Sequence, residues 1–166
     1  PELIITKEIS KSNDWIVYYT VVDGSMDYMR LNSSAAGAGS GLNLPTANYV
    51  YTRGSSSDII NYCFHSVPGY SKIGTYEGNQ SAGHSISVGF QPRFVVIKGV
   101  DAVENWIVHS AVSGMNGTNH IRWNSGGGLD NGANEAISFT STGFSITTAG
   151  AVQINTSGRT YLYSVS

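Results

Sequence analysis

The chain has 166 residues, enough for one domain, and only 12% of them are charged. Its formal net charge of −2 gives no electrostatic reason to expect binding to nucleic acid or to an anionic membrane, and no apolar run approaches the roughly 18 residues of a membrane-spanning helix. With 20 glycines and abundant Ser, Thr and Asn, the composition is typical of β-rich, loop-rich extracellular proteins rather than of helical enzymes.

Strand signals run along the whole chain, and no long window repeats apolar residues with the period of a helix. The predicted strands are residues 3–6, 15–22, 28–31, 49–53, 59–67, 71–77, 85–90, 119–123, 136–140, 144–148, 151–155 and 160–165, together with the apolar runs of 92–110. Some 13 or 14 short strands need two stacked sheets or a closed barrel, because one open sheet would leave a face wet. We therefore predict an all-β domain, a β-sandwich of jelly-roll type.

Residues 1–19 have a near copy at residues 92–110. Pro1, Lys7, Trp15, Ile16 and Val17 recur as Pro92, Lys98, Trp106, Ile107 and Val108. Downstream, Arg30, Asn32 and Ser33 recur as Arg122, Asn124 and Ser125, while Tyr62 and Phe64 align with Tyr161 and Tyr163. We predict one domain over residues 1–166, built from two tandem copies of one β motif, 1–67 and 92–166, with connecting strands in 68–91.

The strand predicted at residues 28–31 alternates in polarity. Met29 and Leu31 are predicted to face the core, and Tyr28 and Arg30 the opposite side. The matched strand of the second copy keeps this pattern, with Trp123 on the core side. The preserved parity favours a half-buried strand in both copies.

Trp15 and Trp106 open apolar strands at matched positions, so we expect both to pack in the core. Cys63 is the single cysteine of the chain and cannot form an internal disulfide. Because it lies within an apolar run, we expect a buried free thiol rather than a nucleophile or a metal ligand.

Several segments together resemble a domain family of phage tail-fibre and other virion proteins, found in cyanophages and marine phages among others. The segments are PELIITK, DWIVYY, YMRLNSSAA, NYCFHSVPGYSKIGTYEGN, GFQPRFVVIK and TYLYSV. The resemblance implies a concanavalin-A-like, laminin-G-like β-sandwich with no assigned reaction. It also implies a place on the virion surface, other virion subunits as partners, and a homo-oligomer, with a trimer expected for a fibre. The chain departs from the family pattern at 109–112, where many relatives have an Asp and then an Arg.

No motif in the chain points to catalysis. The histidines stand in no HxH or HExxH setting, there is no GxSxG elbow, and the 11 acidic residues are scattered. We therefore expect a non-enzymatic module that recognises a host-surface glycan or protein. A purely structural capsid or fibre domain is the alternative, and a glycan-degrading enzyme, which needs two carboxylates about 5 Å apart, is a second one.

Candidate ligand-binding residues combine aromatic rings with amide and guanidinium groups. They are Tyr28, Arg30, Tyr76, Asn79, Arg122 and Asn124. The loops expected to form the recognition surface are 33–44, 78–83, 114–119 and 126–135, where Gly, Ser and Asn provide adaptable hydrogen bonds. For the two arginines, the plainer interpretation is a surface ion pair with Asp27 or another nearby acid.

A calcium site is predicted within one of these loops. Asp130, Asn131, Asn134 and Glu135 offer clustered oxygen ligands, and laminin-G-like domains can bind calcium at a rim. The alternative is a solvated turn, since Asp-Asn-Gly is ordinary turn chemistry. No other cofactor is expected.

Overall fold

The structure, a computed structural model, describes residues 1–53, 58–112 and 114–166, and this part of the chain is all-β. Its strands are β1 (Leu3–Glu8), β2 (Ile16–Tyr19), β3 (Asp27–Arg30), β4 (Ala38–Gly39), β5 (Ile59–Phe64), β6 (Lys72–Glu77), β7 (His84–Ser87), β8 (Phe94–Gly99), β9 (Ile107–Ser110), β10 (Ile121–Arg122), β11 (Ile137–Thr140), β12 (Gly143–Ile146) and β13 (Thr160–Val165). Within the described residues the single helix is the 3-10 turn η1 (Ala133–Glu135), and none is long and apolar enough to cross a membrane. The predicted all-β class is confirmed.

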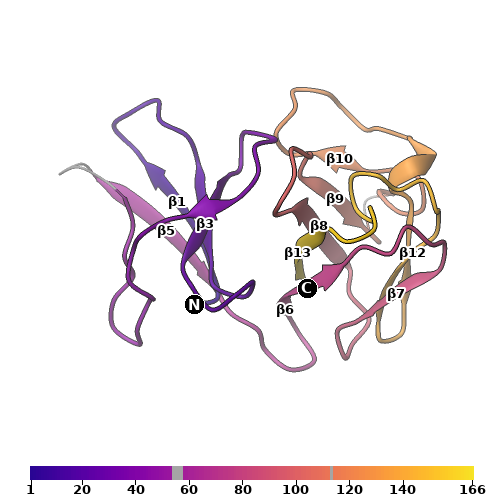
Figure 1. Ribbon diagram of the computed structural model, residues 1–166, viewed down its shortest axis with the longest axis horizontal. Coiled ribbons are helices and arrows are strands. Elements are labelled where there is room, and N and C mark those ends of the chain that lie inside the picture. The colour runs from indigo at the N-terminus through magenta and orange to yellow at the C-terminus, as the bar shows by residue number, and fades with distance from the viewer. Residues whose placement is uncertain (54–57, 113) are drawn as a thin grey trace.

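The strands form three antiparallel sheets. The N-terminal sheet has the order β4-β3-β2-β1-β5, the central sheet β10-β9-β8-β13-β6, and the covering sheet β11-β12-β7. In Figure 1 the N-terminal sheet lies on the left, and the labelled strands of the other two sheets lie on the right. This stacking of antiparallel sheets is consistent with a β-sandwich.

The N-terminal and central sheets share one strand arrangement. In the N-terminal sheet, β1, β2 and β3 follow one another as neighbours, and β5 returns to pair with β1. In the central sheet, β8, β9 and β10 do the same, and β13 returns to pair with β8. Three consecutive strands and a fourth beside the first make a Greek key, so each sequence copy contributes one.

Matched residues of the two copies make matched hydrogen bonds. The side-chain oxygen of Asn32 accepts from the backbone N–H of Trp15 at 3.1 Å, and that of Asn124 accepts from the N–H of Trp106 at 2.9 Å. In both copies the bond ties the end of the third strand to the start of the second. The two asparagines therefore have the same role in both copies: each holds the start of the second strand in place.

The matched lysines also have one task in both copies. Lys7 Nζ donates to three carbonyl oxygens in and beside the β1–β2 turn, at 2.6 to 3.0 Å. Lys98 Nζ donates to two in the β8–β9 turn, at 2.7 and 3.4 Å. Lys98 is fully buried, and this burial lowers its pKa to about 8 against the attraction of Glu104 and Asp101. Each ammonium group thus holds the turn of its hairpin together by binding the turn carbonyls.

We expect Lys7→Met to lower the free energy of unfolding by about 1–2 kcal/mol, because the turn carbonyls lose their charged donor. Urea unfolding followed by circular dichroism measures the change. Lys72→Met, on the exposed edge strand β6, is the matched control and should leave stability within about 0.5 kcal/mol of the parent. Equal effects of the two substitutions would contradict the role of Lys7 in the turn.

Two hydrophobic cores lie on the two faces of the central sheet. The first core joins it to the N-terminal sheet and includes Leu3, Val17, Tyr19, Met29, Val96, Trp106, Val108 and Leu162. The second joins it to the covering sheet and includes Val95, Ile97, Ile107, Ile137, Phe144, Ile146, Tyr161 and Tyr163. Neighbouring residues of β8 alternate between the two cores, as strand geometry requires. The central sheet is therefore buried on both faces.

Two predicted strands, 49–53 and 151–155, are wrong. The first has no ladder, and Val50 packs instead on the outer face of the N-terminal sheet. In the second, the N–H of Asn155 donates back to the carbonyl of Ala151 at 2.7 Å, which closes a turn. In both segments, alternating or clustered apolar residues serve packing without strand pairing.

Predictions of burial are right for some residues and wrong for others. Trp106 is 3% exposed, as expected of a core residue. Trp15 is 37% and Trp123 is 39% exposed, and Cys63 is exposed as well, so the expected burial of these three is wrong. The physical reason for Cys63 is its place on β5, which forms one edge of its sheet.

The strand register also corrects the alignment of the last matched block. Ile5 pairs with Tyr62, whereas Val96, the match of Ile5, pairs with Ser164. Tyr62 therefore corresponds to Ser164 and not to Tyr161. A shift of three residues reverses the face of a strand, which explains why Tyr161 packs in the second core.

Candidate functional site

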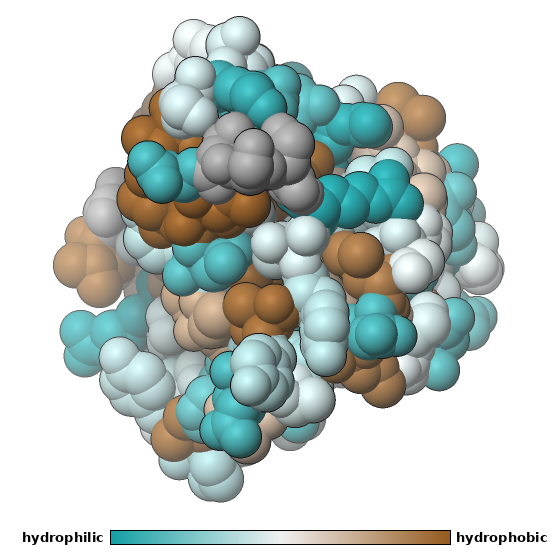
Figure 2. Space-filling model, turned by 90° about the vertical axis from the view of Figure 1, so that its left-hand side faces the viewer, coloured by the Kyte–Doolittle hydropathy of each residue, from teal (hydrophilic) through white to brown (hydrophobic). Residues whose placement is uncertain are grey.

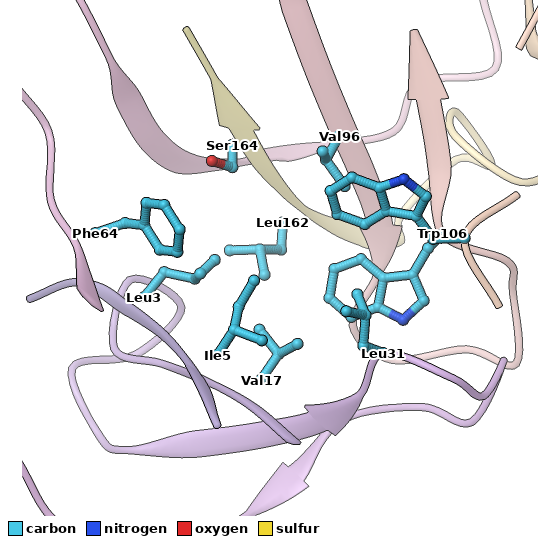
Figure 3. Close-up of a pocket in the computed structure, with 10 residues that line it drawn as sticks. Leu3, Ile5, Val17, Leu31, Phe64, Val96, Trp106, Leu162 and Ser164 are labelled. Carbon is cyan, nitrogen blue, oxygen red and sulfur yellow. The ribbon is translucent and has the colours of Figure 1, made fainter. Parts of the chain in front are cut away.

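An apolar pocket of about 100 Å³ lies between the N-terminal and central sheets. Its lining consists of Leu3, Ile5, Val17, Leu31, Phe64, Val96, Trp106, Trp123, Leu162 and Ser164. Figure 3 shows Phe64 at one end and Trp106 at the other, with the aliphatic side chains between them. Apart from the two indoles, only the Ser164 hydroxyl is polar, so the pocket lacks groups to orient a polar ligand. It is a gap at the margin of the first core.

A larger, polar groove of about 540 Å³ lies on the outer face of the N-terminal sheet. Its lining consists of Thr6, Glu8, Lys11, Ser12, Asn13, Asp14, Ile16, Tyr18, Tyr28, Arg30 and Arg53. All but Ile16 carry a polar group. Figure 2 views the molecule from this side, where hydrophilic and hydrophobic residues alternate over the surface.

Strand register brings the groove residues onto one face. Thr6 of β1 pairs with Ile16 of β2, which pairs with Arg30 of β3. Tyr18 pairs with Tyr28 in the same way. Directly paired residues of antiparallel strands point to the same side, so these side chains line up across three strands. The predicted parity of Tyr28 and Arg30 is confirmed.

Tyrosine rings and guanidinium groups meet in the groove. The rings of Tyr18 and Tyr28 are 6.3 Å apart, and the guanidinium carbons of Arg53 and Arg30 lie 5.0 and 5.8 Å from the Tyr28 ring centre. The backbone N–H of Arg53 donates to the Tyr18 hydroxyl at 2.8 Å, and its guanidinium donates to the carbonyl of Ser40 at 2.5 Å. Burial raises the pKa of Tyr18, which therefore stays neutral. The tyrosines and arginines form one connected, cation-bearing aromatic surface.

The Asp14 carboxylate has a partner for each oxygen. Its Oδ2 lies 2.7 Å from Nε of Arg30, and its Oδ1 accepts from the Asn32 amide at 2.8 Å. Both Arg30 and Asp14 are more than 40% exposed, so the pair orients the guanidinium more than it stabilises the fold.

The Glu8 carboxylate is held in a similar way. Its Oε1 lies 2.9 Å from the Lys11 ammonium, and its Oε2 accepts from the Asn13 amide at 2.6 Å. With their oxygens engaged, Glu8 and Asp14 are arranged as structural groups of the groove wall. This geometry does not provide the free acid and base that glycoside hydrolysis requires.

The same face of the second copy is closed. His109 and His120 stand at the positions that match Tyr18 and Tyr28 of the first copy, their rings are 5.6 Å apart, and both are fully buried. His109 Nε2 donates to the carbonyl of Glu135, just before β11, at 2.9 Å. Burial, with His120 adding to it, lowers the pKa of His109 to about 4. In the second copy, the covering sheet packs on this face and makes it part of the core. The matching face of the first copy is left open as the groove.

Of the six predicted ligand-binding residues, the structure brings Tyr28 and Arg30 together in the groove. Arg122, the match of Arg30, forms an ion pair with Asp130 at 2.7 Å. Asn124 holds the strand entry described above. The expected ion pairs of both arginines are present, although Arg30 pairs with Asp14 and not with Asp27.

The other two predicted residues lie elsewhere. Tyr76 packs against the second core, where it stacks on Tyr161 at 5.2 Å and donates to the carbonyl of Ile154 at 2.6 Å. Tyr76 is therefore partly buried and lies away from the groove, because β6 turns this side chain toward the covering sheet. Asn79 is exposed, and its backbone N–H donates to the Asn155 side chain at 3.0 Å.

The residues predicted to bind calcium do not fit a calcium site. They are Asp130, Asn131, Asn134 and Glu135. Arg122 already supplies the positive charge beside Asp130, whose other oxygen accepts from the Gly132 N–H. The Glu135 carboxylate is buried and accepts from Gln153 at 3.0 Å. Among the described residues no three His, Cys, Asp or Glu side chains are grouped to hold a metal ion.

The predicted recognition loops are partly joined. His120, directly after loop 114–119, bridges to Asp130 in loop 126–135 through two backbone hydrogen bonds of 2.8 and 2.9 Å. Loop 33–44 bonds to the β8–β9 turn, where the Gly37 N–H donates to the carbonyl of Val100.

Sequence reasoning missed the other members of the groove. Glu8, Asp14 and Tyr18 stand on or beside strands whose alternation was legible, and the pairing of Tyr18 with Tyr28 follows once the β2–β3 register is known. Arg53 comes from a segment predicted to be a strand, and nothing local indicates that it reaches Tyr28.

A family model described as "Domain of unknown function (DUF7483)" matches residues 1–165. No curated protein and no solved structure matches the chain.

Proposed function

The chain belongs to the DUF7483 family, described as a domain of unknown function, and we propose that it is a non-enzymatic virion module that binds a host-surface glycan. The observation that carries the proposal is the polar groove of about 540 Å³ on the outer face of the N-terminal sheet. A concavity of this size falls within the range of about 300–1,000 Å³ that is usual for small-ligand sites. It combines two tyrosines with two arginines, two carboxylates and several neutral donors and acceptors.

The groups in the groove suit a hydroxylated ligand. A tyrosine ring offers an apolar face for the C–H side of a sugar, and a guanidinium offers a planar fork of donors for neighbouring hydroxyl or carboxylate oxygens. Arg30 is held by Asp14, and Arg53 by its bond to Ser40, so both are ordered before the ligand arrives. Such preorganisation reduces the entropy lost on binding.

Binding without hydrolysis is the better-supported activity. The two carboxylates of the groove are bound by cationic and amide donors within the wall, as described above. A hydrolase needs one protonated carboxyl beside the glycosidic oxygen. Glycan degradation therefore receives no support from this groove.

A structural role within the virion is the second candidate, and one observation favours it. The edge strand β5 exposes apolar side chains, with Ile60, Tyr62 and Phe64 all more than 40% exposed. Exposed apolar patches mark contact surfaces between proteins. Assembly through β5 and glycan binding through the groove use opposite faces of one sheet and are compatible.

The test is binding of the labelled domain to intact candidate host cells, before and after the surface polysaccharide is stripped. We expect saturable binding that is lost on stripping and unchanged by a calcium chelator. Tyr28→Ala should weaken it about tenfold, because one stacking and cation–π platform is worth about 1–2 kcal/mol. Tyr49→Ala, at a tyrosine 68% exposed and outside the groove lining, is the matched control and should bind like the parent. Binding that survives stripping, or that is indifferent to Tyr28→Ala, would refute the proposal.

A further inference from the structure

β5 differs from the other strands at the ends of the sheets. β4 and β10 have only two residues each, and β7 and β11 have four. β6 is as long as β5 but carries Lys72 and Glu77 at its ends. β5, with the sequence IINYCF, has six residues and neither charge, proline nor glycine. Charges and short length are the usual protection of an edge against pairing, and β5 has neither.

The second copy shows what completes such an edge. β13 takes the place in the central sheet that β5 takes in the N-terminal sheet. On its far side β13 pairs along its whole length with β6, antiparallel, from Thr160 opposite Glu77 to Val165 opposite Lys72. Within the described residues, β5 pairs with β1 alone. An antiparallel strand is therefore the occupant that this edge is built to accept.

We propose that this occupant is β5 of a second copy of the chain, which pairs antiparallel about a two-fold axis at Tyr62. In this register Tyr62 lies opposite Tyr62 of the second copy, and Ile60 lies opposite Phe64 of the second copy. The side chains of Ile60, Tyr62 and Phe64 point to one face of the sheet. This is the face of Leu3 and Ile5, with which Phe64 and Tyr62 pair in the same chain. The side chains then form one apolar row across the axis.

The chemistry of β5 favours a second copy over a foreign strand. Because β5 is uncharged, the two-fold pair places no like charges opposite each other, and its apolar face meets an identical apolar face. Each aromatic or β-branched cross-strand pair contributes about 0.2–1 kcal/mol, in addition to the new ladder hydrogen bonds. The resulting sheet is continuous across both copies.

Cys63 reports on this register directly. It is exposed and is the only cysteine of the chain. With Tyr62 on the axis, Cys63 lies opposite Asn61 of the second copy, and the two Cys63 residues are diagonal neighbours about 7–8 Å apart. A bis-maleimide of matching span should therefore link two parent chains through their single thiols.

The experiment combines sedimentation velocity over a wide concentration range with bis-maleimide crosslinking of the parent chain. We expect a concentration-dependent dimer and a Cys63–Cys63 link. Tyr62→Lys places a charge on the apolar row and should give a monomer that does not crosslink. Val152→Lys, the same charge at a residue 54% exposed near the covering sheet, should dimerise and crosslink like the parent.

Circular dichroism melts test whether Tyr62→Lys is folded, which is expected because this side chain is 48% exposed. The parent crosslink tests the proposal without any substitution. A parent that stays monomeric and unlinked would overturn it. So would an oligomer, dimer or trimer, that lacks the Cys63 link or persists in Tyr62→Lys.

Discussion

Trp106→Ala should lower the free energy of unfolding by about 3–5 kcal/mol, whereas Trp15→Ala, the same change at the matched position, should cost about 1 kcal/mol or less. Trp106 is 3% exposed and belongs to the first core. Its indole N–H donates to the carbonyl of Arg30 at 2.9 Å, a bond from the second copy to the first. Its removal opens a cavity and leaves that carbonyl without its donor.

Trp15 lies at the equivalent place but is 37% exposed, so its truncation returns less apolar surface to water. Urea unfolding of both variants, followed by circular dichroism, measures the difference. The comparison is controlled by the duplication itself, since the two residues open equivalent strands. Similar losses of unfolding free energy in the two variants would contradict the difference in burial between Trp106 and Trp15.

The second large effect is a loss of folding stability at acidic pH. His109 has a pKa of about 4 in the folded chain, against about 6.5 when it is unfolded. Between these values the unfolded chain binds more protons than the folded one, so lowering the pH favours unfolding. The contribution of His109 is fully present above pH 6.5 and is lost as the pH falls to 4. The loss amounts to about 3 kcal/mol.

His109→Gln should remove this part of the acid sensitivity while keeping an amide N–H for the carbonyl of Glu135. Glu104 acts in the opposite direction, because burial raises its pKa and acidification then favours its folded form. The difference between the variant and the parent therefore isolates His109. His65→Gln, at an exposed histidine, should keep the parent slope. Identical slopes in parent and His109→Gln, measured by urea unfolding between pH 6.5 and 4, would contradict the buried neutral imidazole.

Much of the fold is legible in the sequence because strand alternation and the duplicated blocks are local signals. The parity of Met29 and Tyr28 correctly separates the core face from the outer face. The burial of a tryptophan is harder to predict from sequence. The matched residues Trp15 and Trp106 differ in exposure because Trp106 packs in the first core and Trp15 does not. Strand order also matters: Cys63 lies on β5, which ends its sheet, and it is exposed there.

Only part of the candidate site can be predicted from the sequence, because the rest depends on contacts between distant segments. Tyr28 and Arg30 stand out on a polar strand face, but Arg30 has a matched twin in Arg122, and the sequence does not show which copy is open. The covering sheet decides this by closing the second copy over His109 and His120. Arg53 reaches the groove from a distant segment through contacts that no local pattern encodes.

The place of the groove on the outer face of the N-terminal sheet has a consequence for the proposed binding to cells. In the proposed dimer, antiparallel pairing of β5 with its counterpart places both outer faces on the same side of the continuous sheet, so that both face the same way along the two-fold axis. Two grooves then point toward one surface at a fixed separation, and engagement of the first raises the effective concentration of the second to about the millimolar range. Avidity of this kind exceeds single-site affinity by roughly 10²–10⁴ where repeating glycans lie within reach. If the domain binds a host glycan on a virion, as proposed, weak binding by each groove would suffice for durable attachment, while single contacts would stay reversible.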